Sequence, residues 1–131
     1  MSRLARTEFS LADYSDLKIS VVVHPTEKTL YRAWTKFDGT APDFTAAFCH
    51  FPKPSEKRKP EVLAELHFCH KYLTVSTIAH EALHAAFGFA RHARLVMHED
   101  YGEELLALAV QNITAQTIAF CERKKLPLEI E

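Results

Sequence analysis

Apolar and β-branched residues gather in short stretches along the first half of the chain, each beside a turn signal. The first stretch (LKISVVV) stops at His24-Pro25, where the proline cannot donate to a sheet ladder. The second (LYRAWTKF) carries aromatic residues and stops at Asp38-Gly39, and the third (FTAAFCHF) follows a turn that contains Pro42. The pattern predicts strands over residues 17–23, 30–37 and 44–51.

A fourth stretch, residues 61–69 (EVLAELHFC), alternates between apolar and mixed positions, which is typical of a strand. One predicted face carries Val62, Ala64, Leu66 and Phe68. The other face carries Leu63, Glu65, His67 and Cys69. Because Glu and His share that second face, we expect a half-exposed strand at the edge of the sheet.

The second half of the chain predicts two helices. Thr74 is a suitable N-cap, since its hydroxyl can accept a bond from a first-turn amide, and the helix should run to about Ala90. A connection follows over residues 89–100, and a second helix is expected over residues 101–124, with cations near its C-terminal end. We expect the first helix to pack through Ile78, Leu83, Ala86 and Phe87.

Strands followed by two helices indicate an α+β fold. We expect a small mixed sheet of about four strands, packed on the helix over residues 74–90 and on the C-terminal helix. Residues 1–16 are weakly patterned and predict a short helix or an arm on the body. No repeat or long linker divides the chain, so residues 1–131 are expected to form a single domain.

The composition is that of an ordinary globular protein, with 47% hydrophobic and 25% charged residues among 131. A formal charge of −1 supplies no net field, so we expect neither a nucleic-acid partner nor a membrane. No stretch approaches the roughly 18 apolar residues of a membrane span, and charges interrupt the N-terminus before any signal-peptide core. These features predict a cytoplasmic location.

Two other features have simple explanations. Cys49, Cys69 and Cys121 are odd in number and form no C-x-x-C, which favours buried reduced thiols. Residues 52–60 combine three prolines with four basic side chains, which is typical of a solvated loop.

The chemistry-bearing stretch is His80-Glu81-Ala82-Leu83-His84, an H-E-x-x-H sequence within the first predicted helix. His80 and His84 are one helical turn apart and therefore project from the same face. Two imidazoles so placed can bind one metal ion, and Glu81 can reach a water on that ion. The stretch predicts a zinc site with Glu81 as its base.

A catalytic zinc ion usually has three protein ligands and one open position. The chain offers three sources for the third ligand. The pair Glu103-Glu104 opens the second predicted helix, 19 and 20 residues after His84. His98 lies 14 residues after His84, and His92 lies 8 after it.

HEALH followed by the helix start GEELLA resembles the zincin superfamily, and within it the gluzincin pattern of H-E-x-x-H with a downstream helical glutamate. The chain is similar to small phage and prophage metallopeptidases in which H-E-x-x-H-A precedes E-E-x-x-A. On this resemblance Glu104, with Ala107 three places later, matches the third ligand best, with Glu103 as the alternative. One position departs from the pattern, since Leu108 stands where gluzincins carry a supporting acidic residue.

The resemblance implies a zinc metallopeptidase that hydrolyses peptide bonds in a protein or peptide substrate. Glu81 is expected to take a proton from the attacking water as general base. Candidates for stabilising the oxyanion or the substrate are His92, His98 and Tyr101.

Two alternatives stay open. In one, the chain is a non-catalytic metal-binding domain that regulates or interacts, although such a site would not require Glu81. In the other, it resembles the SprT-like proteases of DNA–protein crosslinks, with His98 as the third ligand and residues 53–59 as the basic contact with DNA.

Overall fold

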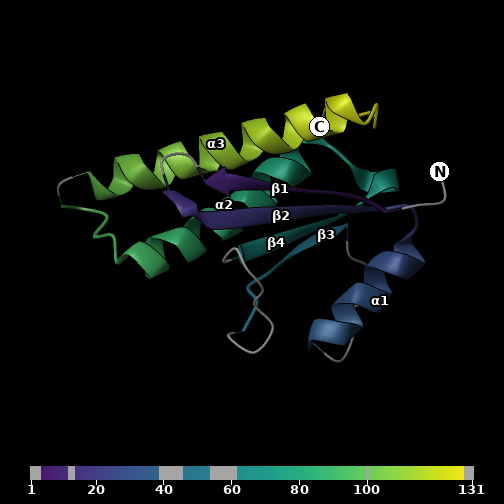
Figure 1. Cartoon of the computed structure of the whole chain (residues 1–131), viewed down its shortest axis with the longest axis horizontal. Helices are drawn as coiled ribbons and strands as arrows, with labels where there is room; N and C mark the ends of the chain where they lie inside the picture. The colour runs from purple at the N-terminus through teal and green to yellow at the C-terminus, as the bar shows by residue number, and fades with distance from the viewer. Residues whose placement is uncertain (1–3, 12–13, 39–45, 54–61, 100, 129–131) are drawn as a thin grey trace.

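The computed structural model describes residues 4–11, 14–38, 46–53, 62–99 and 101–128 (Figure 1). Four strands and three helices form the body, with a single turn of 3-10 helix at His70–Tyr72. In chain order the elements are β1 (Ala5–Leu11), β2 (Tyr14–His24), α1 (Glu27–Asp38), β3 (Ala47–His50), β4 (Val62–Cys69), α2 (Val75–Ala93) and α3 (Gly102–Arg123).

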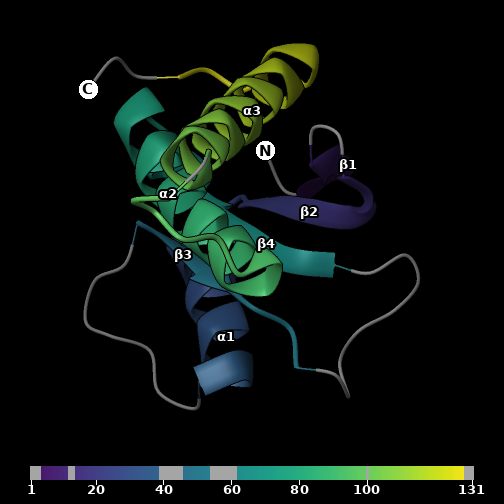
Figure 2. The same ribbon diagram turned by 90° about the vertical axis from the view of Figure 1, so that its left-hand side faces the viewer.

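The strands form one mixed sheet in the order β1-β2-β4-β3. β2 and β4 are parallel, and the outer pairs β1–β2 and β3–β4 are antiparallel. Figure 2 shows α2 and α3 together on one side of the sheet and α1 on the other. The prediction of an α+β fold with a four-stranded mixed sheet and two helices packed on it is therefore confirmed.

The main core lies between the sheet and the pair α2–α3. Val21, Leu66 and Phe68 supply its sheet side, and Ile78, Phe89, Ile113 and Phe120 supply its helix side. Each of these side chains is at most 1% exposed. This burial aligns α2 along β3 and β4, and α3 along β1, where Gln116 donates from Nε2 to the Ser10 carbonyl at 3.4 Å.

The expectation that residues 61–69 form an edge strand is wrong. β4 lies between β2 and β3, and both of its faces are covered. Its second face, which carries Glu65 and His67, lies beneath α1, and these two polar residues bond to each other. The edge strand beside α2 is β3.

The prediction of a strand over residues 30–37 is also wrong, because this segment forms α1. Its aromatic residues favour a strand by propensity, but its apolar positions recur at helical spacing. Thr26 caps the helix by accepting a bond at Oγ1 from the Thr29 amide at 3.2 Å. The apolar stripe that packs around Phe48 and Cys69 consists of Leu30, Ala33, Trp34 and Phe37.

The N-terminal segment forms a strand and not the helix or arm expected there. β1 pairs with β2 from Ala5 opposite Val23 to Leu11 opposite Tyr14. One face of β1 is open, with Arg6 and Glu8 exposed, which explains its weak apolar pattern. The first predicted strand, residues 17–23, lies within β2.

The third predicted strand is shorter in the structure. β3 covers Ala47–His50, Phe51 follows it, and residues 44–45 lie outside the described part of the chain. Most of the basic loop, residues 54–61, lies outside it too.

Helix α2 begins where the sequence predicts. Thr74 accepts a bond at Oγ1 from the Thr77 amide at 2.9 Å, which confirms the N-cap. The helix continues through residues 89–93, which were expected in the connection, and ends at Arg94 in the left-handed conformation.

The packing side of α2 is only partly as expected. Ile78 and Ala86 are buried, but Leu83 and Phe87 are 44% and 43% exposed. These two lie on the same side of the helix as His80 and His84, because residues three and four apart share a face. The exposed side of α2 is therefore both histidine-bearing and apolar.

Helix α3 matches its predicted bounds to within one residue. By length and a mean hydropathy of 1.2 it is also able to cross a membrane. Its apolar residues Ala109, Ile113 and Phe120 are nevertheless used in the core against α2 and the sheet. α3 starts at Gly102, which is pressed against the backbone of Val96.

Gly102→Ala should lower the free energy of unfolding by about 1–3 kcal/mol, because the new Cβ would meet the Val96 carbonyl. Gly88→Ala is the matched control. Its Cβ would meet the ring of Phe51, which is 36% exposed and can turn toward solvent, and alanine favours a helix by up to about 1 kcal/mol. Urea unfolding of both variants measures the difference. A Gly102→Ala protein as stable as Gly88→Ala would contradict the close approach at the start of α3.

Candidate functional site

His80 and His84 lie together on the exposed side of α2. Their ring centroids are 5.0 Å apart, and the ring planes are inclined by 72°. The His80 side chain is 67% exposed, and His84 is exposed as well. Both imidazoles are therefore open to solvent on one turn of helix, which is the arrangement that a shared divalent cation requires.

Glu81 has the opposite environment. It is 6% exposed, and its Oε2 lies 3.9 Å from Nε2 of His80. Burial raises the pKa of Glu81 to about 6, with a smaller opposing effect from His80. The carboxylate can accept a proton and release it again near neutral pH, which a general base must do.

Glu81 faces strand β3. Burial, and after it the charge of Glu81, raises the pKa of Cys49 to about 12. Cys49 therefore stays a neutral thiol beside the carboxylate. Cys69 and Cys121 are buried, and all three cysteines are free thiols, as the sequence predicts.

A hollow of about 530 Å³ opens beside His80 and Glu81. It lies where the N-terminal part of α2, the start of β3 and α1 meet. Its lining consists of Trp34, Ala46, Ala47, Ser76, Thr77, His80 and Glu81. The hollow is thus bordered by the edge strand on one side and by His80 and Glu81 on the other.

The described part of the chain does not place a third ligand beside the histidine pair. Among the described residues, no three His, Cys, Asp or Glu side chains are close enough together to hold a metal ion. Glu103 and Glu104 are exposed in the first turn of α3, and His92 and His98 are exposed near the α2–α3 connection. Two imidazoles are thus placed to bind a cation, and no third donor of the described residues lies beside them.

The two carboxylates at the start of α3 point to different sides of the helix. Glu103 shares a stripe with Leu106, Val110 and Ile113, which pack in the core. Glu104 shares a stripe with Ala107 and Gln111, which are exposed. Glu103 therefore continues the packed side of α3, and Glu104 continues its outer side.

The candidates for substrate contact lie away from the hollow. Tyr101 is 76% exposed at the start of α3, His92 is exposed in the last turn of α2, and His98 is exposed in the connection. None of the three is part of the lining of the hollow.

A second cluster, on the other face of the sheet, was not expected from the sequence. His67 donates or accepts at Nδ1 with Nε2 of His24 at 2.9 Å, and its own Nε2 lies 3.1 Å from Oε1 of Glu65. His24 and His67 are each 4% exposed, and the His67 ring stacks on Phe48 at 4.5 Å. Neither histidine is therefore a surface residue. The strand alternation puts Glu65 and His67 on one face, but His24 joins them only through the β2–β4 pairing.

The charge of Glu65 determines which ring nitrogens carry protons in the row Glu65–His67–His24. The hydrogen bond from His67 lowers the pKa of Glu65, so the carboxylate only accepts. His67 therefore donates from Nε2 and accepts at Nδ1 from Nε2 of His24. Burial, followed by the charges of His67 and Arg6, lowers the pKa of His24 to about 4, and burial lowers that of His67. Both rings are neutral at pH 7, and Nδ1 of His24 has no partner among the described residues.

Comparisons of the chain with protein-family models, curated proteins and solved structures give no match. The zincin resemblance therefore stays a prediction that depends on residues 80–84 and the first turn of α3.

The burial of His24 predicts a pH-dependent stability. Its pKa of about 4 in the folded protein lies below the ordinary 6.5, so the unfolded chain takes up the proton first as the pH falls. The stability of the protein relative to a His24→Asn variant should fall by on the order of 3 kcal/mol between pH 6.5 and pH 4, with no change above that window. Denaturant unfolding of both proteins across this range measures it. A constant difference would contradict a buried neutral His24.

Proposed function

We propose that the chain is a zinc-dependent metallopeptidase in which His80 and His84 hold the metal ion and Glu81 is the general base. The observation that carries the proposal is the juxtaposition at the start of α2. A solvent-open imidazole pair stands beside a buried carboxylate, and His80 and Glu81 border a hollow at the edge of the sheet. A bound zinc ion supplies the Lewis acidity that polarises a peptide carbonyl and lowers the pKa of a water toward 7.

The environment of Glu81 supports its role. A general base works best when its pKa is near the working pH, and burial brings the pKa of Glu81 to about 6. An exposed carboxylate would have a lower pKa and would be a weaker base. Glu81 can thus take the proton from the attacking water and deliver it to the leaving amine.

Strand β3 suits an extended peptide. It ends the sheet, so one side of its backbone is not paired with a strand of the described sheet. A peptide added along this side would follow β3 into the hollow beside Ala46 and Ala47, which also contains His80 and Glu81. The substrate class is therefore an extended protein segment or peptide.

The third ligand in this proposal is a carboxylate from the first turn of α3. Glu104 has the spacing and the following Ala107 of the gluzincin pattern, whereas Glu103 lies on the packed stripe of the helix. Binding of zinc by either one requires the start of α3 to approach the histidine pair more closely than in this structure. His98 remains the alternative of the SprT-like pattern.

Glu81→Gln should leave zinc content unchanged and reduce peptide cleavage by at least about a hundredfold, because it removes the proton acceptor and no metal ligand. Zinc is counted by metal analysis, and cleavage is followed on an unfolded casein substrate. Glu122→Gln, an exposed position at the far end of α3, is the matched control and should keep full activity. Cleavage that survives in Glu81→Gln would remove Glu81 from the mechanism.

Among Glu103→Ala, Glu104→Ala and His98→Ala, we expect one of the two glutamate variants to lose zinc affinity by at least about tenfold. The other variants should bind zinc as the parent protein does. Zinc titration against a competing chelator measures each affinity. Loss only in His98→Ala would favour the SprT-like ligand set, and no loss in any variant would rule out a third ligand from this segment.

A further inference from the structure

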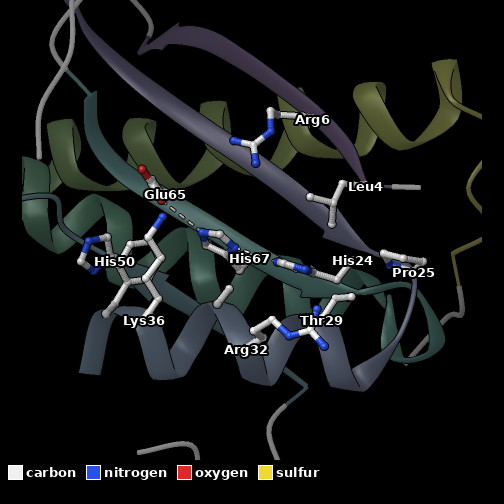
Figure 3. A pocket seen from close by; sticks show the side chains of 12 residues that line it. Leu4, Arg6, His24, Pro25, Thr29, Arg32, Lys36, His50, Glu65 and His67 are labelled. Atoms are coloured by element: carbon white, nitrogen blue, oxygen red, sulfur yellow. Dashed lines mark hydrogen bonds and ion pairs between the residues drawn. The ribbon is translucent and has the colours of Figure 1, made fainter. Parts of the chain in front are cut away.

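A cavity larger than the hollow beside His80 and Glu81 lies on the α1 side of the sheet, across the sheet from α2 (Figure 3). It has a volume of about 740 Å³, within the roughly 300–1,000 Å³ usual for small-molecule sites. Every strand and α1 contribute to its wall. The chemistry proposed for His80, Glu81 and His84 uses none of its residues.

Three cations line this cavity. Arg6 comes from β1, and Arg32 and Lys36 come from successive turns of α1. Like charges four residues apart repel one another on a helix. Within the described part of the chain, no carboxylate lies at ion-pair distance from any of the three. No carboxylate of the described residues therefore pairs with these three cations of the lining.

The one carboxylate of the lining, Glu65, is already engaged by His67. Figure 3 shows the Glu65–His67–His24 row between Arg6 on one side and the α1 cations on the other. Because His24 and His67 are neutral, three cations and one carboxylate leave an excess of two positive charges. The neutral His24 and His67 rings add no charge to the lining, so this excess is available to attract an anion.

Two aromatic side chains stand together in one wall of the cavity. The Phe37 and His50 rings are stacked with their centroids 3.7 Å apart and their planes within 10°. Such a wall suits the organic part of a ligand, while the cations suit its charged part. Guanidinium groups also match the geometry of phosphate oxygens with paired N–H donors.

We propose that the cavity between α1 and the sheet binds a small phosphate-bearing molecule, with its phosphate held by Arg6, Arg32 and Lys36 and its organic part against Phe37 and His50. A phosphate monoester carries close to two negative charges at pH 7, which balances the excess charge of the lining. The site is separate from the proposed peptidase centre, and the two hollows share two elements, α1 through Trp34 and β3 through Ala47 and His50.

The test is calorimetric titration of the full chain with pyrophosphate, with citrate as a carboxylate of comparable charge. Pyrophosphate should bind saturably at one site per chain and more weakly as salt is added. Arg6→Gln and Arg32→Gln should each weaken binding by about tenfold, since each removes charge-assisted hydrogen bonds. The two variants lie on different elements, so a folding defect in one, detected by circular dichroism, leaves the other as a test.

Lys28→Gln is the matched control, because Lys28 is an exposed cation of α1 outside the cavity lining. It should bind pyrophosphate as the parent protein does. Equal weakening in Lys28→Gln would indicate general attraction to surface charge and overturn the site. The absence of saturable binding would overturn it as well. Citrate binding as tight as that of pyrophosphate would overturn the assignment to phosphate.

Discussion

The fold depends on the burial of both faces and both edges of β4. Its backbone pairs with β2 and β3, Leu66 and Phe68 enter the main core, and His67 and Cys69 lie beneath α1. A strand so enclosed can carry polar side chains only if their bonds are completed inside the protein. Glu65 and His67 satisfy this constraint by bonding to each other and to His24. The position of β4 thereby places α2 on one face and a polar row on the other.

Glu81 and Glu65 have different environments, which shift their pKa values in opposite directions. Burial without a donor raises the pKa of Glu81, whereas the hydrogen bond from His67 lowers that of Glu65. Glu81 is therefore suited to proton transfer, and Glu65 remains a constant negative charge that orients a histidine. The sheet separates the two, so each face of the molecule has its own electrostatic character. Helix α1 and strand β3 border both hollows, so an occupant of one could affect the other through either element.

The exposed side of α2 shows a similar division. His80 and His84 share it with Leu83 and Phe87, which are large apolar groups left in solvent. The alanine-rich opposite side allows α2 to lie close to the sheet, and Gly88 admits the ring of Phe51. Helix α2 therefore packs closely against the sheet on one side. Its other side is apolar and histidine-bearing, which suits the peptide substrate proposed above.

The sequence by itself determined the features that depend on neighbouring residues. The bounds of α3, the Thr74 cap, the turn between His80 and His84, and the strand character of residues 17–23 and 62–69 all follow from local spacing and hydrogen bonding. The class of fold followed from their order. Local propensity gave the wrong prediction for residues 30–37. The aromatic residues of α1 pack against Phe48 and do not form a strand. Only the tertiary structure decided that β4 is central, that Leu83 and Phe87 are exposed, and that His24 meets His67. Those facts depend on strand pairing and helix packing between distant segments, which no local pattern encodes.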